Sequence, residues 1–222
     1  MRPLPKGKNR TGRLENFALL VIVFALILGV MILLQVQRTA PYIIVNICLL
    51  LASRAMLKRD YGVDIFRPSE TRPGRQLFLG AAYGALIFLQ VFLLTLLITE
   101  LLSIPLQLFP WLAADAAMEL IVLSLGLNLL MRCAASYAEE AFWRLYCWRA
   151  LEDAGLPRVA VLLVITLIFA LGHKPGISWI SVALIGLSGL GFGLLRMKYG
   201  EGSFLLTGTA HFVFNLLELF IM

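Results

Sequence analysis

Three short motifs that carry ionisable or amide side chains lie inside otherwise apolar segments of the C-terminal half of the chain. They are Glu139, Glu140 and Arg144 in SYAEEAFWR, Phe169 and His173 in FALGH, and His211 and Asn215 in HFVFN. Each group contains two residues four positions apart, which places the pair on one face of a helix. Ionisable groups in apolar segments cost from about 2.5 kcal/mol each, so they persist where they form pairs or perform chemistry.

The two adjacent glutamates are expected to have different roles, because neighbouring side chains on a helix point about 100° apart. Glu140 has a cation, Arg144, four residues further on, and that pairing lowers the cost of burying both charges. Glu139 has Trp143 at the same spacing and is therefore the freer carboxylate, suited to act as a general base. The alternative is an ordinary interfacial helix end that carries a solvated salt bridge.

Two routes to amide hydrolysis would use these groups. In one, Glu139, His173 and His211 hold a divalent metal such as zinc, which activates a water molecule, although the usual HExxH arrangement is absent from the sequence. In the other, no metal takes part: Glu139 removes a proton from a water that His173 orients, while His211 and Asn215 donate hydrogen bonds to the oxyanion.

Each group also has an ordinary structural interpretation. His173 stands beside Lys174 and Pro175, as a histidine at a helix end would, and His211 with Asn215 could form an interhelical hydrogen-bond pair. The occurrence of three such groups within one half of the chain favours a common site. Ser136 lies close to the glutamates, but nothing in the sequence indicates that it is a nucleophile.

The composition predicts an all-α, polytopic membrane helix bundle. Of the 222 residues 60% are hydrophobic and 14% are charged, whereas soluble domains carry about 25% charged residues. The three cysteines form neither a disulfide framework nor a CxxC metal pair. The net charge of +6 comes from residues at segment ends, which is typical of membrane proteins and not of nucleic-acid binders.

Apolar runs of about 20 residues indicate the membrane spans. Clear spans are predicted at 17–34, 77–99 and 177–195, and shorter or interrupted ones at 41–57, 159–172 and 203–222. A single helix over 118–153 would be roughly 54 Å long, so it must bend, protrude or break near 132–136. The unbroken form gives seven transmembrane helices and the broken form gives eight.

The chain is expected to have three parts, beginning with a disordered basic cytoplasmic tail at 1–13. N-terminal transmembrane helices follow at 14–116 with a polar loop at 58–76, and a transmembrane core occupies 117–222. Lys and Arg concentrate in the tail and in the 58–76 loop, which predicts a cytoplasmic N-terminus. A glycine-rich stretch at 186–193 indicates close helix packing or, alternatively, a hinge.

In this order, EExxxR, FxxxH and HxxxN resemble the signature of the CPBP intramembrane proteases, which include type II CAAX prenyl endopeptidases and bacteriocin-processing and self-immunity proteins. The resemblance covers about 120–222 and makes 117–222 the catalytic core. It implies that Glu139 activates water, that Glu140 and Arg144 support it, that His173 positions the water, and that His211 and Asn215 form the oxyanion site. Trp143 and Leu145 replace the Phe and Gly common in the family.

The resemblance implies an integral protein of the bacterial plasma membrane that cleaves a membrane-associated protein or peptide. No feature of the sequence indicates that this substrate is prenylated. One alternative is a non-catalytic protein on the same scaffold, such as a bacteriocin self-immunity or membrane binding protein. Another is a proton-coupled transporter, although the internal repeat that many transporters show is absent.

Overall fold

The computed structural model describes residues 11–19, 21–22, 39–66, 72–103, 118–173 and 177–219, and these residues form helices, turns and no strand. The all-α prediction is therefore confirmed for this part of the chain. The helices are α2 (Thr39–Tyr61), α3 (Pro73–Leu102), α4 (Met118–Glu139), a π-helix (Glu140–Cys147), α5 (Trp148–Asp153), α6 (Arg158–Gly172), α7 (Trp179–Tyr199), a 3₁₀-helix (Glu201–Ser203) and α8 (Phe204–Glu218).

Local sequence signals explain where several helices begin and end. Pro73 starts α3, where its missing N–H has no intrahelical partner to lose. Ser178 caps α7 by accepting a hydrogen bond from the Ser181 N–H at 3.0 Å. Gly155 and Gly200 have φ of 97° and 75°, which suits glycine and allows the chain to turn after α5 and α7.

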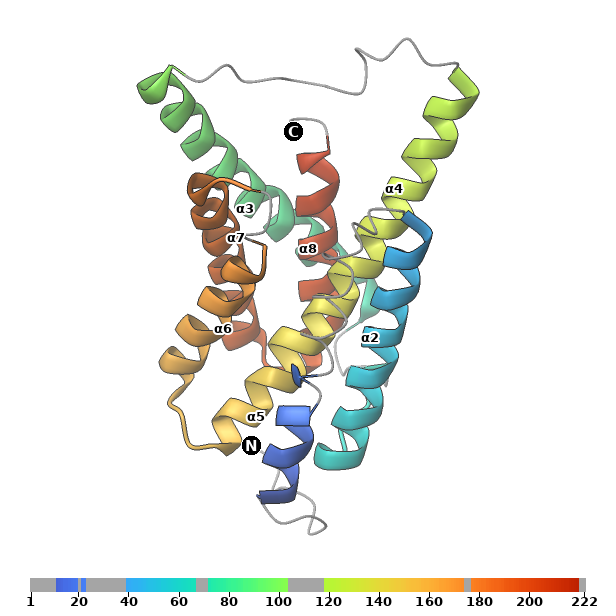
Figure 1. Cartoon of the computed structure of the whole chain (residues 1–222), viewed down its shortest axis with the longest axis vertical. Coiled ribbons are helices and arrows are strands. Elements are labelled where there is room, and N and C mark those ends of the chain that lie inside the picture. The colour runs from blue at the N-terminus through green and yellow to red at the C-terminus, as the bar shows by residue number, and fades with distance from the viewer. Residues whose placement is uncertain are drawn as a thin grey trace.

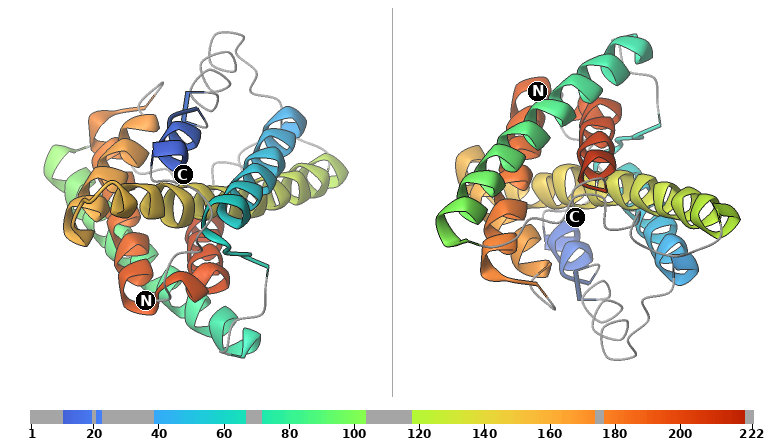
Figure 2. Two further views of the ribbon diagram at one scale, coloured as in Figure 1. Left: turned by 90° about the horizontal axis from the view of Figure 1, so that it is seen from below. Right: turned by 90° about the horizontal axis from the view of Figure 1, so that it is seen from above.

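The longest element is the helical rod formed by α4, the π-helix and α5, which crosses the molecule obliquely (Figure 1). Helix α2 packs along one side of the rod, while α6 and α7 pack together on the other. Helix α8 packs against both α3 and α4, and the views along the bundle show it between them (Figure 2). The rod therefore contributes to a site that α6, α7 and α8 can also reach.

The rod has no break at 132–136, so the predicted division of 118–153 at that point is absent. It departs from α geometry further on, in the π-helix, which holds Glu140 and Arg144. Two of the described helices, α3 and α7, are long and apolar enough to cross a membrane, and α6 is a shorter apolar helix. The predicted total of seven or eight spans is not confirmed, and 23–34 of the first predicted span lie outside the described residues.

The N-terminal part of the chain forms ion pairs close to the ends of α5 and α2. Of the predicted tail, 1–10 lie outside the described residues, and 11–13 begin a helical stretch in which Arg13 binds Asp153 at 2.7 Å. The loop after α2 begins at Gly62, where Asp64 accepts two hydrogen bonds from Arg54 at 2.9 and 3.0 Å. These bonds lower the pKa of Asp64 to about 2.

Helix α3 has a glycine face and an apolar face. Most of its large apolar side chains are exposed, which is typical of a surface that contacts lipid. On the opposite face Gly80 and Gly84 let α8 approach closely, because a Cβ at Gly84 would lie 2.3 Å from the Ala210 oxygen. Gly193 of α7 likewise has Leu162 against it, so the packing interpretation of the 186–193 stretch fits the structure.

The α3–α8 contact can be tested by a substitution that adds one methyl group to a glycine of α3. We expect Gly84→Ala to destabilise the protein by about 1–3 kcal/mol, because the backbones of α3 and α8 must separate to admit the new Cβ. The measurement is the midpoint of thermal unfolding in detergent. Gly74→Ala, on the same helix but with no atom near the new Cβ, is the control. Equal midpoints for the two variants would contradict the packing described here.

Candidate active site

The π-helix buries an ion pair in the centre of the bundle. Glu140 is 0% exposed and Arg144 is 1% exposed, and Arg144 Nη1 lies 3.2 Å from Glu140 Oε1. The guanidinium also lies over the Phe169 ring at 4.3 Å and donates to the Gly189 oxygen at 3.4 Å. The predicted pairing of Glu140 with Arg144 is thus present, in a dry environment and not at a solvated helix end.

The ion pair is incompletely hydrogen-bonded. Glu140 Oε2 and Arg144 Nε are both buried without a hydrogen-bond partner among the described residues. Two buried charges with unsatisfied atoms are a poor source of stability. Their presence therefore points to a functional role for this part of the molecule.

His211 of α8 lies between the two glutamates. Its Nδ1 is 3.0 Å from Glu140 Oε1, and its Nε2 is 3.8 Å from Glu139 Oε2. Phe192 stacks on the imidazole with ring centroids 4.5 Å apart and an angle of 22°. In this hydrogen bond the imidazole Nδ1–H donates to the carboxylate of Glu140, which is paired with Arg144. The adjacent glutamates thus contact opposite nitrogens of one ring.

Glu139 differs from Glu140 in that it borders a cavity. Its side chain is 14% exposed, and the cavity has a volume of about 320 Å³. Three further candidate residues, His173, His211 and Asn215, line the same cavity. The remaining lining residues are Tyr42, Met131, Arg132, Ala135, Phe169, Ile185, Ser188, Phe214 and Glu218.

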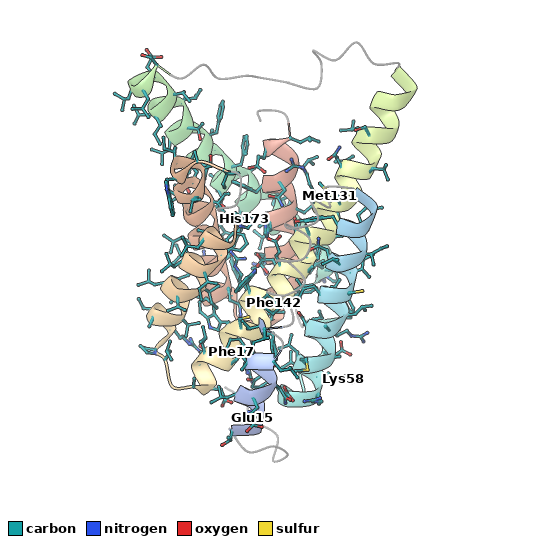
Figure 3. The ribbon with its side chains drawn as sticks, in the orientation of Figure 1. Glu15, Phe17, Lys58, Met131, Phe142 and His173 are labelled. Carbon is teal, nitrogen blue, oxygen red and sulfur yellow. The ribbon has the colours of Figure 1, made fainter. Side chains whose placement is uncertain are left out.

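His173 follows the last residue of α6, so it is a helix-end histidine and a cavity residue at once. Figure 3 shows it at a height similar to that of Met131 on α4, which also lines the cavity. Its Nδ1 lies 2.8 Å from the backbone oxygen of Phe169. A carbonyl only accepts, so Nδ1 carries a proton, and in the tautomer protonated at Nδ1 alone the Nε2 is an acceptor.

Asn215 lies one turn beyond His211 on α8. Its Nδ2 donates to Ser136 Oγ at 3.0 Å, and Ser136 in turn donates to the Arg132 oxygen at 2.7 Å. An amide nitrogen has two N–H groups, so one of them stays available for another acceptor. The hydroxyl proton of Ser136 is thus engaged with a backbone carbonyl.

Several contributors to the site were not expected from the sequence. Arg132 joins α4 to α8 by donating to the Asn215 oxygen at 2.9 Å and to Glu218 Oε2 at 3.1 Å. Arg132 and Glu218 are charged residues in apolar segments, so the signal that identified the glutamates could also have identified these two residues. The stacking of Phe192 and the role of Ser136 had no such signal, because aromatic and serine residues are common in membrane helices.

The metal route has no support from the geometry. Within the part of the chain that the structure describes, no group of three or more His, Cys, Asp or Glu residues lies close enough to bind a metal ion. The proposed set of Glu139, His173 and His211 therefore does not gather into a ligand cluster. These side chains do not fit a metal ion in this arrangement.

Residues 85–217 match the type II CAAX prenyl endopeptidase Rce1-like family. The chain belongs to this family. The membership confirms the resemblance read from the sequence, and it means that the chain is a membrane protein of a protease family. The match extends further toward the N-terminus than the motifs do and includes most of α3, the helix that packs on α8. No curated protein and no solved structure matches the chain.

The different environments of the two glutamates predict different effects on stability. We expect Glu140→Gln to cost about 3–5 kcal/mol, because it leaves the buried Arg144 charge without a counterion. Glu139→Gln, at the cavity wall, is expected to change stability far less. Thermal unfolding of both variants in detergent checks this difference. A Glu140→Gln variant as stable as Glu139→Gln would show that the buried pair is misassigned.

Proposed function

We propose that the chain is an intramembrane endopeptidase that hydrolyses a peptide bond of a membrane-associated protein or peptide. The observation that carries the proposal is the cavity lined by Glu139, His173, His211 and Asn215, with His211 placed between two glutamates of unlike environment. Membership of a protease family supports the same reaction class.

Glu139 is the proposed general base. It is the carboxylate on the cavity, while Glu140 is already engaged by Arg144 and by His211 Nδ1. A water molecule in the cavity would give its proton to Glu139 as its oxygen attacks the carbonyl carbon of the substrate. Glu139 would later return this proton to the leaving nitrogen. The C–N bond then breaks, and the products are a carboxylic acid and an amine.

His173 is proposed to orient the attacking water. Its Nδ1 proton is directed to the Phe169 oxygen, which leaves Nε2 as an acceptor for one O–H of the water. The second O–H would then point to Glu139. Orientation of this kind converts a mobile water into a nucleophile at a defined distance and angle, which is a large part of the catalytic effect.

His211 and Asn215 are proposed to stabilise the tetrahedral intermediate. The free N–H of the Asn215 amide and the Nε2 of His211, when protonated, are donors at the cavity wall. Glu140 Oε1 accepts from His211 Nδ1 at 3.0 Å, which holds the imidazole in place at the cavity wall. Donors that are already in place where negative charge develops lower the barrier without reorganisation.

We further propose that the N-terminus lies in the cytoplasm and that 117–222 form the catalytic core in a bacterial plasma membrane. The basic residues before α3 support this orientation. The proposed catalytic side chains come from α4, the π-helix, α8 and the residue that follows α6, which all belong to that core.

The test is cleavage in cells. We expect Glu139→Gln to abolish processing and His173→Ala to reduce it at least about 100-fold, because the base and the water-orienting group are lost. Quantitative proteomics of cells that carry Glu139→Gln, beside cells with the unchanged chain, would show which membrane-associated protein accumulates uncut.

The matched control is Glu100→Gln, which makes the same substitution at an exposed glutamate near the end of α3. This variant should process the substrate normally. If Glu139→Gln and His173→Ala both insert, fold and still cleave at the rate of this control, the endopeptidase mechanism is wrong. Persistence of a protective or binding effect in these variants would instead favour a non-catalytic protein.

A further inference from the structure

Arg196, in the last turn of α7, is almost completely buried, with 6% of its surface exposed. Its Nη2 lies 3.6 Å from Glu201 Oε1, which supplies a counterion. Its Nε makes a different contact, a hydrogen bond of 2.9 Å to the backbone oxygen of Arg144. Glu201 Oε1 also contacts Arg149 Nη1, so one carboxylate is shared by two guanidinium groups. The bond from Arg196 to a backbone carbonyl of another helix needs its own explanation.

The irregular backbone at Arg144 gives that explanation. In an α-helix the Trp148 N–H would donate to the Arg144 oxygen, four residues earlier. Here Trp148 donates to the oxygens of Trp143 and Leu145 instead, because the preceding segment is a π-helix. The Arg144 carbonyl therefore does not accept from the Trp148 amide, and it accepts from Arg196 Nε of α7. A buried carbonyl is stabilised by such a donor.

The same helix also contacts the other end of Arg144. The Gly189 oxygen of α7 accepts from Arg144 Nη2 at 3.4 Å, and Gly189 lies two turns before Arg196, on the same face. Helix α7 thus contacts both the backbone and the guanidinium of Arg144. The guanidinium lies against Glu140, and Glu140 contacts His211.

We propose that Arg196 is a positioning residue that completes the hydrogen bonding of the π-helix and thereby sets the positions of Arg144, Glu140 and the His211 ring. This inference rests on the proposed function only where it concerns catalysis. The structural contact from Arg196 to the Arg144 carbonyl is testable without any activity. Its alternative is that Arg196 only forms an ion pair with Glu201.

Two substitutions of similar length separate these possibilities. Arg196→Gln removes the charge but places an amide nitrogen at the chain position of Nε, so a donor for the Arg144 carbonyl is kept. Arg196→Met removes both the charge and the donor. Glu201→Gln is the control for the ion pair, because it leaves the Arg196–Arg144 bond in place.

The direct readout is a backbone carbonyl resonance. When arginine is ¹³C-labelled at the carbonyl and leucine is ¹⁵N-labelled, only Arg-Leu sequences give a carbonyl-to-amide correlation. The chain has two, Arg13-Leu14 and Arg144-Leu145, so the first is an internal reference. We expect the Arg144 carbonyl signal to shift upfield in Arg196→Met and to stay near its original place in Arg196→Gln and Glu201→Gln.

The consequence for the site is read from the two histidines. In ¹⁵N-histidine-labelled protein, the Nδ1 signal of His211, assigned with a His173→Asn variant, reports its bond to Glu140. This signal should change in Arg196→Met and be retained in Arg196→Gln. For a synthetic peptide spanning the cleavage site of a protein that accumulates in Glu139→Gln cells, kcat should fall about tenfold or more in Arg196→Met, with KM within about twofold.

Equal carbonyl shifts in Arg196→Met and Arg196→Gln would overturn the inference, as would an Arg144 carbonyl that responds to Glu201→Gln. These outcomes do not depend on cleavage. If the resonances behave as expected but Glu139→Gln still cleaves, the positioning role stands and the proposed function fails. If Arg196→Met does not fold, Arg196→Lys replaces it, because lysine keeps the positive charge for Glu201 but has a methylene at the position of Nε; the Arg144 carbonyl signal should then shift upfield in Arg196→Lys, and an unchanged signal would overturn the inference.

Discussion

The buried pair of Glu140 and Arg144 is the constraint around which the core is organised. Two charges with essentially no exposed surface must be matched by neighbours, since an unpaired charge in this environment would cost several kcal/mol. The neighbours come from separate helices: the Phe169 ring from α6, the Gly189 oxygen from α7 and the His211 imidazole from α8. The pair therefore links three helices to the rod.

Close helix packing makes these contacts possible. Gly84 allows α3 to meet α8 at the backbone beside Ala210, and Gly189 lets α7 approach the Arg144 guanidinium and the Phe169 ring. In lipid the apolar exterior supplies little drive for association, so small residues and polar contacts decide which faces meet. His211 is adjacent to Ala210, so the α3–α8 contact also influences the position of the imidazole within the bundle.

The same arrangement gives two chemically identical side chains different environments. Glu140 is enclosed and paired with Arg144, whereas Glu139 borders the cavity on the other side of the His211 ring. The proposed base, Glu139, lies next to the cavity and Glu140 lies behind the imidazole, an arrangement suited to proton transfer. The incomplete hydrogen bonding of the buried pair is a cost that a functional site tolerates.

The sequence by itself determined the helical class, the membrane setting, the family and the six candidate residues, because charged and amide groups in apolar runs are conspicuous and obey helical spacing. It could also assign Glu140 to Arg144, which is a local contact. Only the tertiary structure decided that His211 lies between the glutamates, that Ser136 binds Asn215, and that Arg196 binds the Arg144 carbonyl. Those contacts depend on helix tilt and on the π-helix at Glu140–Cys147, which arise from packing between distant segments and leave no periodic signal along the chain.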